Sequence, residues 1–130
     1  MSDERFPVTW SGRTAVVAVP AEVDVTNSDG LREALLSALN AGAHGLVVDM
    51  AGTTFCDSAG ITALARAARR AAANETVMRL AVTAPAVLRV LNLVGIDRLI
   101  DVYPSVTDAL ASLPGPTGDQ TDDQADGLVR

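Results

Sequence analysis

The sequence of 130 residues contains no lysine, one cysteine, one histidine and few aromatic residues, and each shortage excludes a class of function. Without lysine the chain cannot form the usual phosphate-binding loop, which ends in Gly-Lys-[Ser/Thr]. One histidine and one cysteine are too few for a zinc site of the usual composition. Aromatic residues make up 3% and the net charge is −6, so the basic patch and the stacking platform of nucleic-acid-binding proteins are missing. We expect no metal, no cofactor and no nucleic acid ligand.

Long hydrophobic runs are also absent. No apolar run approaches the roughly 18–20 residues that cross a bilayer, and the N-terminus lacks the pattern of a secretory signal. The single cysteine, Cys56, cannot form an internal disulfide, as is typical of proteins in a reducing compartment. The sequence therefore predicts a cytoplasmic protein without direct membrane insertion.

The composition divides the chain into one domain and a tail. Apolar residues make up 48% and charged residues 20%, which is enough apolar material for one core. Residues 114–130 contain two prolines, three glycines and four aspartates without apolar periodicity, so we expect an acidic, disordered tail. The folded domain is expected to span residues 6–113, after a flexible N-terminus at residues 1–5.

Short β-branched runs alternate with helical patterns along this domain. Strands are predicted at residues 8–10, 14–19, 45–50, 78–83 and 99–103. Helices are predicted between Asn27 and Gly42, from Ser58 to about Ala73, from Pro85 to Gly95, and from Pro104 or Ser105 to Leu113. The alternation predicts an α/β fold, with a mixed, largely parallel sheet of four to five strands and about four helices packed on it.

The second predicted helix has an apolar and a basic side. We predict that its buried stripe consists of Ile61, Leu64, Ala65, Ala68 and Ala72. Arg66, Arg69 and Arg70 lie on the far side, where they form either an ordinary solvated face or a partner-binding face continuous with Ser58.

The stretch around Ser58 has both a structural and a functional interpretation. Asp57 and Ser58 are favoured residues at a helix start, and Gly60 allows close packing in the first turn. The same geometry places a hydroxyl beyond the carboxyl end of a strand, where open α/β sheets hold their sites. The free N–H groups of the helix start would tolerate a phosphate on Ser58, because they can donate hydrogen bonds to its oxygens.

Other candidate groups favour structural roles. A nucleophilic pair would require His44 and Cys56, but apolar surroundings and Asp57 are expected to raise the pKa of the Cys56 thiol. A hydrolase using Ser58 or Cys56 lacks a base, an oxyanion partner and a metal set, so we expect no enzyme. Thr53 and Thr54 are expected to bond nearby backbone groups, with a minor acceptor role left open, and Asp49 is expected to be structural.

Four stretches carry a resemblance to a known family. They are residues 46–61 (LVVDMAGTTFCDSAGI), residues 21–24 (AEVD), residues 90–96 (VLNLVGI) and residues 99–110 (LIDVYPSVTDAL). In this order they resemble the signature, the early Gly-Glu-[hydrophobic]-Asp element, the late helix and the last strand and helix of STAS domains, the anti-sigma factor antagonist family. Ala21 departs from the glycine of that element. Ala59 stands where many members have a second Ser or Thr, which leaves Ser58 as the acceptor candidate of the motif.

The resemblance implies a bacterial regulator of transcription. Such antagonists, when unphosphorylated, bind an anti-sigma factor, which is a serine kinase with a histidine-kinase-like ATPase fold, and thereby release the sigma factor. Phosphorylation of the motif serine, here Ser58, switches them off, and a serine phosphatase resets them. The partner surface that the resemblance and the helix pattern suggest consists of Asp24, Thr54, Asp57, Ser58, Ala59, Gly60 and Arg66. The alternative is a non-phosphorylated STAS adaptor subunit of a membrane transporter assembly.

Overall fold

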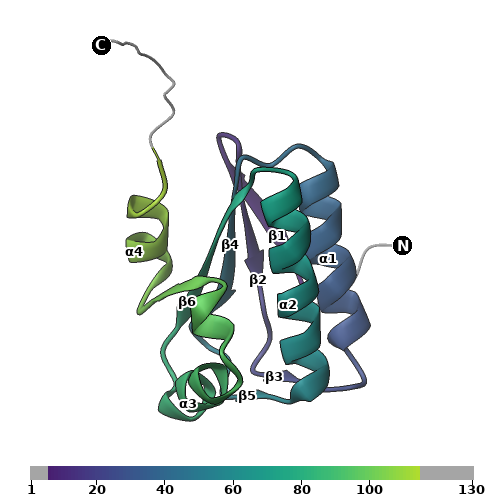
Figure 1. The fold of residues 1–130 in the computed structure, drawn as a ribbon, viewed down its shortest axis with the longest axis vertical. Helices are drawn as coiled ribbons and strands as arrows, with labels where there is room; N and C mark the ends of the chain where they lie inside the picture. Colours follow the sequence, from purple (N-terminus) through teal and green to yellow (C-terminus); the bar gives the residue numbers. More distant parts are fainter. Residues whose placement is uncertain (1–5, 115–130) are drawn as a thin grey trace.

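The structure, a computed structural model, describes residues 6–114 (Figure 1). The expected flexible segment at residues 1–5 and the expected tail beyond Pro114 lie outside the described residues. The strands are β1 Val8–Ser11, β2 Thr14–Ala18, β3 Glu22–Val23, β4 Gly45–Met50, β5 Phe55–Cys56, β6 Val77–Val82 and β7 Asp101–Tyr103. The helices are α1 Ser28–Asn40, α2 Ser58–Ala73, α3 Pro85–Val94 and α4 Val106–Ala111, with a short 3₁₀ turn, η1, at Ile96–Arg98.

The main sheet is mixed and largely parallel, as the sequence predicts. Its five strands lie in the order β1-β2-β4-β6-β7, with β1 antiparallel to β2 and the other neighbours parallel. Central β4 is buried on both faces, which explains its continuous apolar sequence. The carboxyl ends of β2, β4 and β6 therefore lie along one edge of the sheet.

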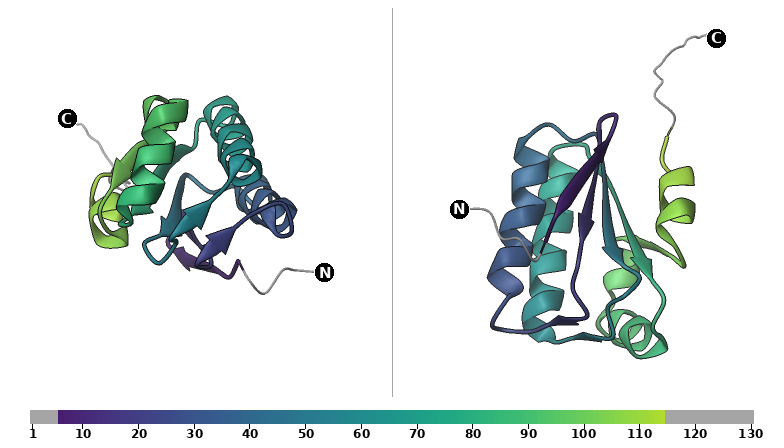
Figure 2. Two further views of the ribbon diagram at one scale, coloured as in Figure 1. Left: turned by 90° about the horizontal axis from the view of Figure 1, so that it is seen from below. Right: turned by 180° about the vertical axis from the view of Figure 1, so that it is seen from behind.

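Helices cover both faces of the sheet. In Figure 1, α1 and α2 lie side by side on one face, and α4 lies on the opposite face against β4 and β6. Figure 2 shows the same arrangement from below and from behind. Leu31 and Leu35 of α1 and Leu64 of α2 are fully buried against the inward residues of the strands. No helix within residues 6–114 has both the length and the apolar character that crossing a membrane requires.

The apolar stripe predicted for α2 was wrong in part. The buried residues of the helix are Gly60, Ala63, Leu64, Ala67 and Ala71. Of the expected stripe, Leu64 is buried, Ile61, Ala65 and Ala68 are partly buried, and Ala72 is exposed. The reason is that α2 packs against α1 as well as the sheet, so the alanines at spacing four are covered by the neighbouring helix.

The sequence analysis missed a second, two-stranded sheet. Strands β3 and β5 pair in parallel with Val23 opposite Cys56, and the Asp57 N–H donates to the Val23 carbonyl at 3.0 Å. This pair joins the loop before α1 to the loop before α2. The last strand is also shorter than predicted, because η1 and a bend occupy residues 96–100 and leave only Asp101–Tyr103 extended.

Candidate functional site

The β3–β5 pair brings two acidic residues together at the carboxyl edge of the sheet. Asp24 follows Val23 and Asp57 follows Cys56, and these two preceding residues are register partners. Ser58 comes next and is the first residue of α2. The arrangement places Asp24, Asp57 and Ser58 in one small region, although Asp24 lies far from the other two in the sequence.

Side chains hold the loop between β3 and α1 in a closed turn. The Asp24 carboxylate accepts hydrogen bonds from the backbone N–H and the hydroxyl of Thr26. The Asn27 side chain accepts from the Asp24 N–H and donates to the Glu22 carbonyl, each at 2.9 Å. Asn27 therefore braces this loop, and its side chain forms no capping hydrogen bond with α1.

Two threonines tie the loop before α2 to the segment before β3. Buried Thr53 donates from its hydroxyl to the Pro20 carbonyl at 2.9 Å. The Thr54 N–H donates to the Ala21 carbonyl at 2.8 Å, and its hydroxyl also reaches that oxygen at 3.3 Å. These acceptors are not local, as was expected, but lie 33 residues earlier in the chain. Complete burial also removes Thr53 as a phosphate acceptor, whereas Thr54 is exposed.

The start of α2 leaves its serine exposed. One oxygen of the Asp57 carboxylate accepts from the backbone N–H groups of Ala59 and Gly60, at 2.9 and 3.2 Å. These N–H groups were expected from the sequence to be free for a phosphate. They are not free, because they already donate to the Asp57 carboxylate. The Ser58 side chain is exposed, and its hydroxyl forms no hydrogen bond with any other residue in the described part of the chain.

Gly60 and Cys56 form the packed base of the site. A Cβ at position 60 would lie 2.6 Å from the Cys56 Sγ and 2.7 Å from the Val23 Cγ1, so the close approach of α2 to β3 and β5 requires glycine. Burial, and secondarily the Asp57 charge, raises the pKa of the Cys56 thiol to about 11. The thiol is therefore protonated and poorly nucleophilic at neutral pH, as expected from the sequence.

The remaining candidates for chemistry lie elsewhere. His44 is exposed and precedes β4, whereas Cys56 and Ser58 follow it, so the histidine is at the opposite edge of the sheet. The Asp49 carboxylate accepts from the Ala51 N–H at 3.1 Å, which confirms its structural role in the turn. Among residues 6–114, no three His, Cys, Asp or Glu side chains gather in a group suited to a metal ion.

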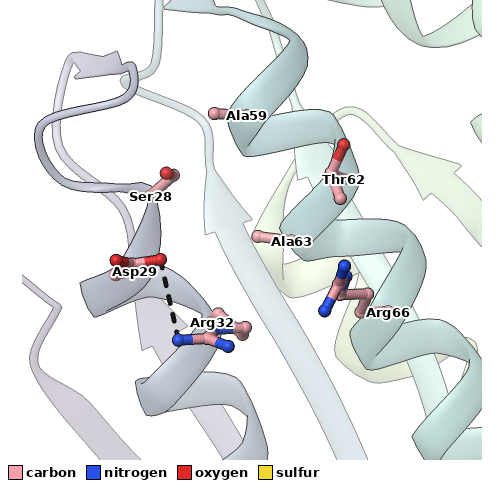
Figure 3. A pocket seen from close by; sticks show the side chains of 7 residues that line it. All are labelled: Ser28, Asp29, Arg32, Ala59, Thr62, Ala63 and Arg66. Carbon is pink, nitrogen blue, oxygen red and sulfur yellow. Dashed lines mark ion pairs between the residues drawn. The ribbon is translucent and has the colours of Figure 1, made fainter.

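A pocket of about 360 Å³ opens between α1 and α2, beside the start of both helices (Figure 3). It is lined by Ser28, Asp29, Arg32, Ala59, Thr62, Ala63 and Arg66. Arg66 and Ala59 belong to the partner surface predicted from the sequence, whereas Arg32 of α1 was missed. No motif marks Arg32; the signal is its spacing of three from Asp29, with which it forms an ion pair at 3.6 Å.

Comparisons with known proteins agree with this architecture. A model of the STAS domain family matches residues 6–109. An anti-sigma factor antagonist from Mycobacterium paratuberculosis superposes with a TM-score of 0.75 at 24% identity, over 85% of this chain and 97% of that one. The anti-sigma factor antagonist SpoIIAA in its unphosphorylated form gives a TM-score of 0.70 at 20% identity, over 81% and 92% of the two chains. Its phosphorylated form from Bacillus gives 0.65 at 19%, over 82% and 96%. No curated protein matches the chain in a sequence comparison.

Proposed function

This chain belongs to the STAS domain family, and from that membership we propose that it is an anti-sigma factor antagonist switched by phosphorylation of Ser58. In this proposal the unphosphorylated chain binds an anti-sigma factor in the bacterial cytoplasm, and the bound sigma factor is released. The observation that carries the proposal is the exposure of Ser58 at the first position of α2. Its hydroxyl forms no hydrogen bond within the described residues, whereas the neighbouring N–H groups of Ala59 and Gly60 are bonded to Asp57.

The proposed binding surface is centred on Ser58 and built from three segments. Asp24 and Asp57 flank the serine, and Thr54 and Ala59 lie on either side of it in the chain. Arg66 extends the surface along α2. Gly60 is buried and contributes by letting α2 approach β3 and β5, so its role is to place Ser58 rather than to touch a partner.

The proposed modification is a phosphoryl transfer by the anti-sigma factor acting as a serine kinase. The Ser58 oxygen forms a bond to the γ-phosphorus of ATP, the bond from that phosphorus to the β–γ bridging oxygen breaks, and ADP leaves. The hydroxyl proton passes to a base that the kinase supplies, since the Asp57 oxygen nearest the helix is engaged as the cap. A serine phosphatase then hydrolyses the phosphoserine and restores the binding form.

The charge of the phosphate accounts for release of the partner. Phosphorylation adds about −1.5 to −2 charges at neutral pH, beside the carboxylates of Asp57 and Asp24. An unpaired or like-charge group in a packed interface weakens binding by several kcal/mol. A loss of about 4 kcal/mol corresponds to roughly a thousandfold weaker complex. No refolding is required, because Ser58 is already exposed.

We propose a binding protein and not an enzyme. The candidate nucleophiles, Ser58 and Cys56, are not activated by the candidate base, because His44 lies at the far edge of the sheet. The raised pKa of the Cys56 thiol also keeps it protonated at neutral pH. The alternative, an adaptor subunit of a membrane transporter, is tested by a pull-down with the wild-type chain that accompanies the binding experiment.

The experiment measures the affinity of wild type, Ser58→Ala and Ser58→Asp for the anti-sigma kinases encoded near this gene. We expect wild type and Ser58→Ala to bind equally, and Ser58→Asp to bind at least a hundredfold more weakly, since a carboxylate carries part of the phosphate charge. Ser37→Asp is the matched control, because Ser37 is an exposed serine of α1 outside the proposed surface. With ATP, wild type should gain one phosphate on Ser58, and Ser58→Ala none.

If all three proteins bind equally, the proposed control by phosphorylation of Ser58 is wrong, whereas the proposed binding to an anti-sigma factor stands. Capture of a transporter complex in place of any kinase would overturn the antagonist function itself.

A further inference from the structure

The pocket between α1 and α2 has an apolar floor and a basic rim. Ala59 and Ala63 form this floor, and Arg32 of α1 and Arg66 of α2 reach the pocket from opposite sides (Figure 3). Two guanidinium groups from separate helices thus face one space of about 360 Å³. Of the described lining residues only Asp29 opposes them in charge, which leaves the pocket with a net positive charge.

Arg32 has hydrogen-bonding capacity that the described chain does not use. Its Nε is buried, and no residue of the described segment accepts a hydrogen bond from it. Its Nη2 lies 3.6 Å from the Asp29 carboxylate, whose side chain is 88% exposed, so solvent weakens this ion pair. A buried donor without an acceptor is unfavourable, and the rest of the guanidinium group keeps donors that the weak ion pair with Asp29 does not satisfy.

Arg66 is equally available. It is exposed, lines the pocket, and forms no ion pair or hydrogen bond within residues 6–114. The planar guanidinium group binds carboxylates and phosphates through two parallel hydrogen bonds. A pair of such groups around a small apolar floor matches a side chain that ends in an oxyanion and has a short apolar stem.

The pocket is continuous with the surface around Ser58. Ser58, Thr62 and Arg66 follow at intervals of four residues on one side of α2, and the Thr62 hydroxyl donates to the Ser58 carbonyl at 2.9 Å. With a rise of about 1.5 Å per residue, Arg66 lies roughly 12 Å along the helix axis from Ser58. A protein that covers Ser58 therefore reaches the pocket in the same interface.

We propose that this pocket receives an aspartate or glutamate side chain of the anti-sigma factor, held between Arg32 and Arg66; the proposal rests on the function proposed above. The pocket is open to solvent, so a free ion would stay largely hydrated and bind weakly. A carboxylate carried by a protein arrives with a surface that excludes water and strengthens the same contacts. This favours a protein side chain over a small anion as the occupant.

The first experiment measures binding of the anti-sigma factor to Arg32→Gln, Arg66→Gln and the double variant. Each single change should weaken the complex about tenfold, or roughly 1.4 kcal/mol. The double variant should weaken it by clearly less than the hundredfold product, because both arginines hold the same carboxylate. Arg13→Gln is the control, since Arg13 is exposed in the turn before β2, at the edge of the sheet opposite Ser58 and outside the pocket, and should change affinity less than about twofold. A loss of affinity in Arg66→Gln alone would contradict the proposal that both arginines hold one carboxylate. A double variant whose loss equals the product of the two single losses would contradict it as well.

The second experiment needs no partner and separates this proposal from the proposed function. In an NMR titration carried to high acetate concentration, because a free ion binds this open pocket weakly, sodium acetate should shift the amide resonances of Ser28, Thr62 and Arg66 toward saturation, whereas sodium chloride at matched ionic strength should not. The shifts should disappear in the double variant. No acetate-specific shift would overturn the oxyanion site. If wild type binds no anti-sigma factor, the proposed function fails, and the acetate result alone decides the site. A site that binds acetate while every variant binds the partner normally would overturn the protein occupant.

Discussion

The starts of α1 and α2 carry related sequences and have opposite exposures. Residues 27–30 (NSDG) and residues 57–60 (DSAG) each place a capping residue, a serine, one variable residue and a glycine at the same spacing. The helices that follow lie side by side on the same face of the sheet (Figure 1). Ser28 is 8% exposed, whereas Ser58 is on the surface.

The residues at the two capping positions also differ in what their side chains bond. Asn27 is buried, and its side chain bonds the Asp24 N–H and the carbonyl of Glu22 in β3 rather than the first turn of α1. Asp57 turns into its helix and bonds the amides of Ala59 and Gly60, which leaves the outer side of the first turn open. The comparison teaches that this sequence pattern does not distinguish an exposed serine from a buried one, whereas the tertiary surroundings do.

The largest expected effect is on phosphorylation. A kinase acts on a hydroxyl that enters its active site, so we expect the anti-sigma kinase to modify Ser58 and to leave Ser28 unmodified. Peptide mass spectrometry after incubation with ATP should place the phosphate on residue 58 alone, and Ser58→Ala should reduce incorporation to background. Phosphate on the Ser28 peptide of folded protein would show that burial does not separate the two serines.

The second expected effect is on stability. Here the change before α1 should have the larger effect, whereas for phosphorylation the start of α2 has it. Asn27→Ala removes two hydrogen bonds and leaves the Asp24 N–H and the Glu22 carbonyl without this partner, so we expect a loss of about 2–4 kcal/mol in the free energy of unfolding. Asp57→Ala removes an ordinary helix cap and should lose only about 1 kcal/mol. Urea denaturation of the two variants and wild type measures both values. Equal losses would mean that the side chains of Asn27 and Asp57 contribute equally to the stability of the fold.

The smallest expected effect concerns the packing beneath α2. Gly60→Ala would press a methyl group against the Cys56 Sγ and the Val23 side chain, so we expect a loss of about 1–3 kcal/mol. Gly52→Ala is the control, because nothing lies within 4 Å of a Cβ there, and its effect should stay within about 0.5 kcal/mol. Thermal unfolding of both variants provides the test. An unaffected Gly60→Ala protein would show that α2 shifts outward at little expense.

The order and type of the main elements were predictable, because each carries a strong local signal. The continuous apolar run of β4 indicates a strand covered on both faces, and the structure confirms it. The capping residues Asp57 and Ser58 and the apolar periodicity predicted a helix from Ser58 to about Ala73, which agrees with the bounds observed. Gly95 was expected to end α3, and it does so in a left-handed conformation.

What the sequence analysis missed depends on contacts between distant segments. Strands β3 and β5 have two residues each, too few to show a period, and they form only because they pair with each other. The Thr53 bond to Pro20 is hidden for the same reason. In α2, the buried side was misplaced because periodicity shows that one side is apolar but not that a second helix covers the alanines beside it.

The candidate site divides in the same way. The resemblance to STAS domains pointed to Asp24, Asp57 and Ser58, and the structure brings together the two segments that carry them. It did not point to Arg32, whose place beside Arg66 results from the packing of α1 on α2.

The sequence by itself determined an α/β chain of alternating strands and helices, because periodicity, caps and turn residues act within a few positions of one another. It also determined the shortage of histidine, cysteine and lysine, since these are matters of composition. Only the tertiary structure decided which serine is exposed, which loops meet and which arginines share a pocket. These properties arise from contacts between segments about 30 residues apart, and no local pattern records them.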